Sequence, residues 1–458
     1  MVGRIERLKL IARAQKLARA QAERERWPRE RREALQRERL TQLVGYAREH
    51  SPYYREALAG YDPEVGVASL PVLDRAAMME RFDDVVTDRR LRRDALLAHV
   101  ETLSGDELYH GRYRATTTSG SSGRKGLFVF DHDGWAWIGG LFLYFSAIAG
   151  TRPRLPRLRT AMVGGASPAH MSRRGAVTLD VGLHRMLALP VTLPMPALVE
   201  ALNRFRPDYL NVYPSMAVLL AEEQLAGRLR LRLRSMSTSS ELRTPEMTER
   251  IAAAFGVQPF DLYATTEGLW ACDCERHDGL HLLEDGVIAE NVDDEGRPVP
   301  DGTPGARLLV TNLTNRVQPL IRLEVSDAVT LSSEPCACGR TLRRMERIEG
   351  RADDILWLPG AGGRRVAVHP MQFAVVARDR DVVEFQVVQE GARVLVSVVG
   401  RGAAPGLEER VRAGLEERLS ALGVREVAID VCRREALARS AGGKLQIVTA
   451  ERRPLTAA

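Results

Sequence analysis

The chain has 458 residues, of which 45% are hydrophobic and 28% charged, and its formal net charge is +6. This composition is typical of a globular protein with two to four domains, and it excludes collagen, a long coiled coil and wholesale disorder. Residues 1–40 alone carry +7 and the remainder −1, and the basic residues of this segment alternate with acidic ones. Such interleaving indicates a solvated amphipathic helix, so neither a nucleic acid nor a membrane is expected as a partner.

Residues 1–60 are predicted to be helical, with a break near Trp27 and Pro28 and an end at residues 51–54. The longest apolar run, from Trp135 to Gly150, is too short to span a bilayer, which predicts a buried helix instead. No secretion signal is recognisable, and five cysteines in so long a chain do not suggest a disulfide framework. The expected location is the cytoplasm.

Short apolar runs alternate with amphipathic stretches between residues 110 and 330. Strands are predicted at 160–163, 209–212 and 307–310, and helices at 195–204 and 245–255. A smaller unit follows, with predicted strands at 384–388, 394–399 and 426–431 and a helix at 406–422. The predicted fold class is therefore α/β: a large multi-layer N-terminal domain, residues 1–350, and a small mobile α+β C-terminal lid domain, residues 351–458.

Lysine is rare in this chain, since only four of the 66 basic residues are lysines: Lys9, Lys16, Lys125 and Lys444. A chain that uses arginine for ordinary positive charge retains lysine where a compact ammonium is needed. Lys9 and Lys16 fall in the basic N-terminal helix. Lys125 and Lys444 are therefore the candidates for a chemical role.

Hydroxyl residues and glycines alternate from Thr116 to Gly126, a run that ends in Lys125 and precedes a predicted strand, Leu127–Phe130. Glycines allow backbone N–H groups to surround phosphate oxygens, while hydroxyls and the lysine add further donors. The run lacks the spacing of the common phosphate-binding loop. Alone, a run of this kind is more often a flexible turn.

Further motifs follow in order: Tyr263 to Glu267, Pro319 to Arg322 with Asp327, Gly350 to Asp354, and Gly442 to Lys444. With the Thr116–Gly126 run and the opening segments at 43–54 and 70–74, this series resembles the adenylate-forming ligase superfamily. Within it, the chain is similar to the phenylacetate–coenzyme A ligase branch. The resemblance covers almost the whole chain.

The resemblance implies ATP and Mg²⁺ as cofactors. Lys444 would bridge the substrate carboxylate and the α-phosphate, Lys125 would stabilise the departing phosphates, and Glu267 would bind Mg²⁺ through an oxygen ligand. Tyr263 would stack on adenine and Asp327 would bind the ribose hydroxyls, with Asp353 as the hinge. The remaining nucleotide-binding residues that it implies are Thr117, Ser119, Gly120, Ser121, Ser122, Gly123, Ser239, Ser240, Glu241, Thr266 and, on the ribose side, Arg351.

The implied reaction has two halves. A small-molecule carboxylic acid attacks ATP to give an acyl-adenylate, and an acceptor then displaces AMP. The acceptor would be a thiol such as coenzyme A, but residues 356–373 depart from the branch's pattern. An amine or other nitrogen nucleophile as acceptor remains an alternative, as does a non-catalytic nucleotide-binding role, against which the presence of Lys444 and Glu267 argues. Assembly as a homodimer is left open.

A second group of residues suits a metal ion, because thiolates and an imidazole are ligands of tetrahedral Zn²⁺. Cysteines occur at 272, 274, 336 and 338, and histidines at 277 and 281. Some members of the branch resemble this arrangement, which implies a structural zinc site at Cys274, His281, Cys336 and Cys338. Cys272 and His277 are the reserve candidates, and buried free cysteines are the alternative.

Aromatic residues are frequent after the phosphate loop, at 135, 137, 142, 144 and 145. They predict either the wall of an acid-binding pocket or part of the hydrophobic core.

Overall fold

The computed structural model describes residues 4–118, 126–165, 167–440 and 442–451. The chain begins with three helices, α1 (Arg4–Arg24), α2 (Arg29–His50) and α3 (Pro52–Ala57), so the predicted break at Trp27 and Pro28 is confirmed. Ser51 caps α3 by accepting a hydrogen bond from the Tyr54 amide. Three further helices follow: α4 (Arg75–Glu80), α5 (Phe82–Val85) and α6 (Arg93–Glu101).

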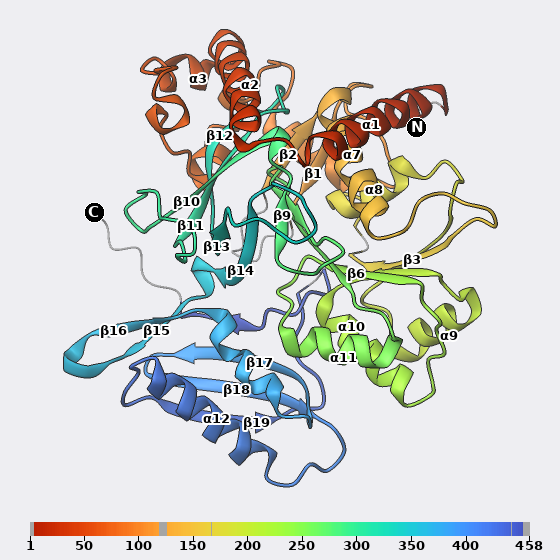
Figure 1. Cartoon of the computed structure of the whole chain (residues 1–458), viewed down its shortest axis with the longest axis vertical. Coiled ribbons are helices and arrows are strands. Elements are labelled where there is room, and N and C mark those ends of the chain that lie inside the picture. The colour runs from red at the N-terminus through yellow and green to blue at the C-terminus, as the bar shows by residue number, and fades with distance from the viewer. Residues whose placement is uncertain (1–3, 119–125, 166, 441, 452–458) are drawn as a thin grey trace.

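A nine-stranded sheet forms the centre of the molecule, with the order β13-β14-β9-β8-β7-β6-β5-β3-β4 (Figure 1). Five neighbouring strands are parallel: β3 (Arg159–Gly164), β4 (Arg185–Pro190), β5 (Tyr209–Val212), β6 (Ser235–Ser239) and β7 (Phe260–Ala264). The other four pair antiparallel: β8 (Trp270–Cys272), β9 (Leu280–Leu282), β13 (Asp327–Ser332) and β14 (Arg344–Arg351). The predicted strands at 160–163 and 209–212 are confirmed.

Helices follow the parallel strands, as right-handed crossover connections require. They are α8 (Met171–Leu179), α9 (Met195–Phe205), α10 (Pro214–Leu225) and α11 (Pro245–Phe255). The apolar helix α7 (His132–Ile148) is buried along much of its length and lies against α1, as predicted for this run. None of the described helices is long and apolar enough to cross a membrane.

Two smaller sheets complete this part of the chain. One pairs β1 (Arg114–Thr117) with β2 (Leu127–Phe130), and the other contains β10 (Val287–Val292), β11 (Arg307–Asn312) and β12 (Leu320–Val325). The strand predicted at 127–130 is therefore confirmed.

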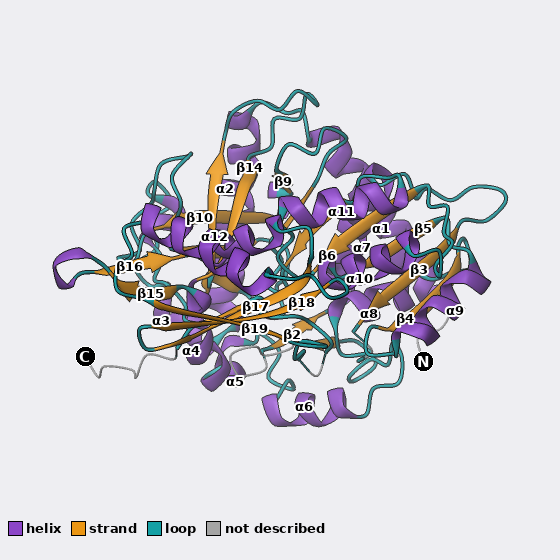
Figure 2. Cartoon of the chain, turned by 90° about the horizontal axis from the view of Figure 1, so that it is seen from below, coloured by secondary structure: helices purple, strands orange, loops and turns teal. Residues whose placement is uncertain are grey.

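The C-terminal part has its own four-stranded sheet, in the order β19-β18-β17-β20. Its strands are β17 (Val382–Glu390), β18 (Arg393–Gly400), β19 (Ala428–Arg433) and β20 (Val448–Thr449), and α12 (Leu407–Ala421) lies beside them (Figure 2). A hairpin of β15 (Leu356–Pro359) and β16 (Arg365–Val368) projects from one side (Figure 1). The predicted α/β class with a smaller α+β C-terminal unit is confirmed.

The C-terminal part does not have a separate core. One cluster of buried side chains contains Leu210 and Met216 of the central sheet region together with Phe373 and Val387. The Arg250 side chain also donates hydrogen bonds of 2.9 Å to the Ala377 and Asp379 carbonyls. This contact holds the segment before β17 against α11.

Candidate active site

A cavity of about 1070 Å³ is lined by residues of the parallel strands, of α7 and α8, and by Ser440 and residues 444–448 of the C-terminal part. Its walls include the predicted hinge residue Asp353 and ten residues that the sequence predicted to bind or activate the nucleotide: Thr117, Ser239, Ser240, Glu241, Tyr263, Thr266, Glu267, Asp327, Arg351 and Lys444. Residues from six separate segments of the chain thus meet at one place. The predicted residues Ser119, Gly120, Ser121, Ser122, Gly123 and Lys125 lie outside the described residues.

Lys444 enters this cavity from a tight loop. The Lys444 amide donates to Ser440 Oγ (3.1 Å), and the Lys444 carbonyl accepts from the Ser440 amide (2.9 Å). Gly443 has φ of +77°, and a Cβ there would lie 2.2 Å from Val191 Cγ1, so only glycine fits. The Lys444 ammonium lies 5.7 Å from the centre of the Tyr213 ring. Burial and the positive charge of Arg351 lower the pKa of Lys444, whereas Glu241 and Asp327 act in the opposite direction.

Glu241 holds this loop in place. Its carboxylate accepts hydrogen bonds from the Leu445 amide (2.8 Å) and the Ser215 amide (3.0 Å), and burial raises the pKa of Glu241. The sequence predicted Glu241 to be a nucleotide-binding residue, and it lines the cavity. Its side chain also joins the start of α10 to the residue after Lys444, a contact between residues 204 positions apart.

Glu267 follows β7 and is only 3% exposed. Its carboxylate forms an ion pair with Arg75, at the start of α4, and its carbonyl accepts a hydrogen bond from Asn312 Nδ2 (2.9 Å). Arg75 also lines the cavity and was missed by sequence reasoning, which had only the Asp74 helix cap as a local signal. A metal ion at Glu267 would have to share or displace the Arg75 contact.

Asp327 lies at the start of β13, which is an edge strand of the central sheet. The Tyr263 hydroxyl donates to Asp327 Oδ2 (2.7 Å), and Arg351 Nε lies 3.8 Å from Asp327 Oδ1, because Asp327 and Arg351 are register partners on β13 and β14. Burial and the Asp327 charge raise the pKa of Tyr263 well above its ordinary value. The three side chains form one polar cluster at the end of the cavity.

The hinge segment after β14 is connected to the Lys444 loop. Gln446 Nε2 donates to Asp354 Oδ1 (2.8 Å), and burial raises the pKa of Asp354 to about 6. The predicted hinge residue is the neighbouring Asp353, which also lines the cavity. Asp354 was not singled out from the sequence because its contact depends on the tertiary fold.

The aromatic residues after the phosphate loop divide between the two predicted environments. Phe142 and Phe145 line the cavity. The other three are buried in the core, where Trp135 Nε1 donates to Thr178 Oγ1 (3.3 Å) and the Tyr144 hydroxyl donates to Glu25 (2.5 Å). One face of α7 therefore contacts the cavity and the other contacts the core.

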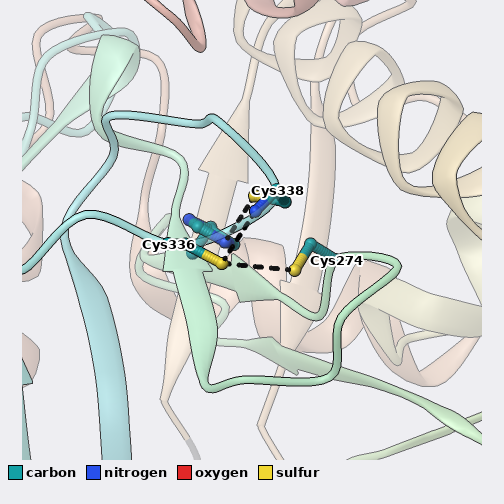
Figure 3. Close-up of side chains that lie close together, drawn as sticks. Cys274, Cys336 and Cys338 are labelled. Atoms are coloured by element: carbon teal, nitrogen blue, oxygen red, sulfur yellow. Dashed lines mark hydrogen bonds between the residues drawn. The ribbon is translucent and has the colours of Figure 1, made fainter.

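The four residues chosen as zinc ligands lie together and are not among the residues that line the cavity. Figure 3 shows three of them, Cys274, Cys336 and Cys338. One ligand atom from each of Cys274, His281, Cys336 and Cys338 lies within 4.8 Å of the others. The Cys274 and Cys336 sulfurs are 3.8 Å apart, and Cys338 Sγ is 3.4 Å from His281 Nε2. This is the donor set of a closed tetrahedral zinc site.

Backbone amides point at each sulfur of this cluster. The amides of Arg276, Cys338 and Arg340 lie 3.4, 3.5 and 3.5 Å from the sulfurs of Cys274, Cys336 and Cys338. Donors of this kind stabilise thiolates, the form in which cysteine binds metal. The reserve candidates lie outside the cluster, since Cys272 packs in the hydrophobic core and His277 Nδ1 contacts Asp273 (3.2 Å).

A scan against protein-family models finds no match. Searches of curated proteins and of solved structures do find relatives. The phenylacetate–coenzyme A ligase of Thermus thermophilus is 30% identical over 377 residues, 78% of this chain and 77% of that protein. A second enzyme of the same name, from Escherichia coli, is 33% identical over 196 residues, 41% of this chain and 42% of that protein.

Among solved structures, a 2-hydroxyisobutyryl-CoA ligase in its postadenylation state superposes with a TM-score of 0.73 at 24% identity. The match covers 94% of this chain and 92% of that one. The same ligase in its thioesterification state gives a TM-score of 0.57 at 23% identity, covering 93% and 91%.

The identity to the Thermus thermophilus enzyme over more than two thirds of both chains makes this protein an adenylate-forming enzyme. Within that superfamily, the chain belongs to the phenylacetate–coenzyme A ligase family.

Proposed function

We propose that this protein activates a carboxylic acid with ATP as an acyl-adenylate and transfers the acyl group to coenzyme A. The observation that carries the proposal is the meeting of Lys444, Glu267, Tyr263 and Asp327 in one cavity. The relative from Thermus thermophilus, which shares the family, is named a phenylacetate–coenzyme A ligase.

The first half-reaction brings a carboxylate to an already charged phosphate, so it depends on cations placed where negative charge develops. Lys444 is assigned to the region between the carboxylate and the α-phosphate. Asp327 would accept hydrogen bonds from the ribose hydroxyls, while Arg351 balances its charge. Glu267 would contribute an oxygen ligand to Mg²⁺, which supplies further positive charge at the phosphates.

The Thr116–Gly126 loop and Lys125 are assigned to the departing pyrophosphate. Residues 351–458 are assigned to a lid that reorients about Asp353 between the two half-reactions. The cytoplasm is the proposed location.

Acid-dependent exchange of labelled pyrophosphate into ATP tests the first half-reaction. We expect exchange in Mg²⁺ buffer only when a suitable acid is present, because pyrophosphate can return to ATP only from an acyl-adenylate. No acid-dependent exchange across a broad panel of aryl and alkyl acids would contradict the proposal.

The acceptor is tested separately, because the sequence of residues 356–373 departs from the pattern of the branch. In the structure these residues form the projecting hairpin and the segment after it. Acceptor-dependent release of AMP should be measured with coenzyme A, carrier proteins and amines. Release with coenzyme A is the expected result. Release with amines alone would favour the alternative of amide or N–N bond formation.

We also propose a structural Zn²⁺ at Cys274, His281, Cys336 and Cys338, supported by the mutual distances of their ligand atoms. Elemental analysis of the purified protein should find about one zinc per chain. Protein that is free of zinc and fully stable would show that the cysteines are only buried thiols.

A further inference from the structure

The part of the cavity beyond the nucleotide-binding residues has the face of the parallel sheet as its floor. Met162, Asn211 and Ser237 are register partners across β3, β5 and β6. Thr160 and Tyr209 are register partners two residues earlier on β3 and β5. Tyr213, whose ring lies near Lys444, follows β5 directly. Asn211 is two residues from Tyr213, so it lies about 7 Å below it along the strand. An acid held at Lys444 would extend towards Asn211.

The floor at this level is polar. Asn211 Nδ2 donates to Ser237 Oγ (2.7 Å), and Ser237 Oγ also bonds the Tyr209 hydroxyl. Tyr209 and Ser237 are buried, whereas Asn211 is partly exposed and lines the cavity. Within the described part of the chain, Asn211 Oδ1 has no hydrogen-bond partner. The side-chain nitrogen of Asn211 is thus held by Ser237, and its side-chain oxygen is available to accept a hydrogen bond from a ligand.

Aromatic side chains also line this cavity. Phe142 and Phe145 of α7 line the cavity together with Trp270 of β8. The rings of Phe142 and Trp270 are 4.6 Å apart and perpendicular. Aromatic side chains in such pairs provide flat, rigid walls for another ring.

We propose that the substrate is an aromatic acid with a hydroxyl or amino substituent, and that Asn211 recognises this substituent by accepting its hydrogen bond. This inference rests on the proposed function, because the position of the carboxylate is set by Lys444. A ring without a donor would cover the amide oxygen and leave it without a hydrogen-bond partner. A site that binds a hydroxyl or amino group therefore discriminates strongly against an analogue that lacks this group. Asn211 is therefore a specificity-determining residue.

The test compares hydroxy-, amino-, methyl- and unsubstituted benzoates and phenylacetates in the pyrophosphate exchange assay. The methyl group matches the hydroxyl group in size but donates no hydrogen bond. We expect kcat/KM for the best hydroxy or amino acid to exceed that of its methyl analogue by about tenfold or more. Asn211→Leu should remove this preference, since leucine has a similar size and no acceptor.

Met162→Leu is the matched control, because Met162 is the register partner of Asn211 and lines the same cavity. This variant should keep the preference. Equal or faster exchange with methyl acids, or a preference that survives Asn211→Leu, would overturn the inference while leaving the proposed function intact. No exchange with any acid would instead overturn the proposed function. If Asn211→Leu does not fold, the wild-type ratio alone decides.

Discussion

Replacing Lys444 by arginine is expected to slow acyl-adenylate formation by about a hundredfold or more, the loss seen when one preorganised charge-stabilising donor is removed. The ammonium of Lys444 occupies a confined position, beside the Tyr213 ring and on a loop held by Glu241 and by the close approach of Gly443 to Val191. A planar, forked guanidinium cannot take the place of a compact ammonium between two groups of oxygen atoms. Lys444→Ala should have a similar effect.

Acid-dependent exchange of pyrophosphate into ATP, with ATP affinity measured in parallel, checks this prediction. ATP affinity should change little, because the lysine charge acts mainly in the transition state. Lys9→Arg is the matched control, since Lys9 is exposed on α1 and pairs only locally with Glu6 (2.8 Å). Near-normal adenylation by Lys444→Arg would show that the catalytic role of Lys444, inferred from the scarcity of lysine, is wrong.

Replacing Cys336 by serine is expected to remove the bound metal and to lower the free energy of unfolding by about 2 kcal/mol or more, since a closed site depends on all of its ligands. For a chain of this size, that corresponds to a fall in the thermal midpoint of roughly 2 °C. The site connects β9 to the segment after β13, which are distant in sequence. Zinc content and thermal unfolding are the measurements.

Cys432→Ser is the matched control for this experiment. Cys432 lies on β19, outside the cluster, and its sulfur is 3.5 Å from Ser397 Oγ. The control should retain both the metal and the thermal midpoint. Equal behaviour of the two variants would refute a structural metal site.

The sequence was informative where short-range spacing determines the result. Strand positions such as 209–212 follow from buried apolar runs, and the helix break follows from Pro28. The rarity of lysine and the order of the motifs identified Lys444, Glu267 and Asp327, which do meet in one cavity. The four cysteine and histidine residues were selected in the same way, and their ligand atoms lie together.

The sequence was uninformative where function depends on contacts between distant residues. The Arg75 partner of Glu267 lies 192 positions away, and nothing near Arg75 indicates that contact. The part that Glu241 plays at the Lys444 loop depends on how the C-terminal part packs. Asn211 was not identified from the sequence, because the contacts of a polar residue within a strand depend on which strands lie beside it.

The central claim is that the acid is activated as an acyl-adenylate. It is tested most directly by supplying acid with ¹⁸O in both carboxylate oxygens and analysing the AMP released after transfer to the acceptor. In an acyl-adenylate, one carboxylate oxygen bridges the acyl group and phosphorus, and it leaves with AMP when the acceptor attacks the carbonyl carbon. The account predicts one ¹⁸O atom in each AMP, whereas unlabelled AMP, or label in another phosphate product, would contradict it.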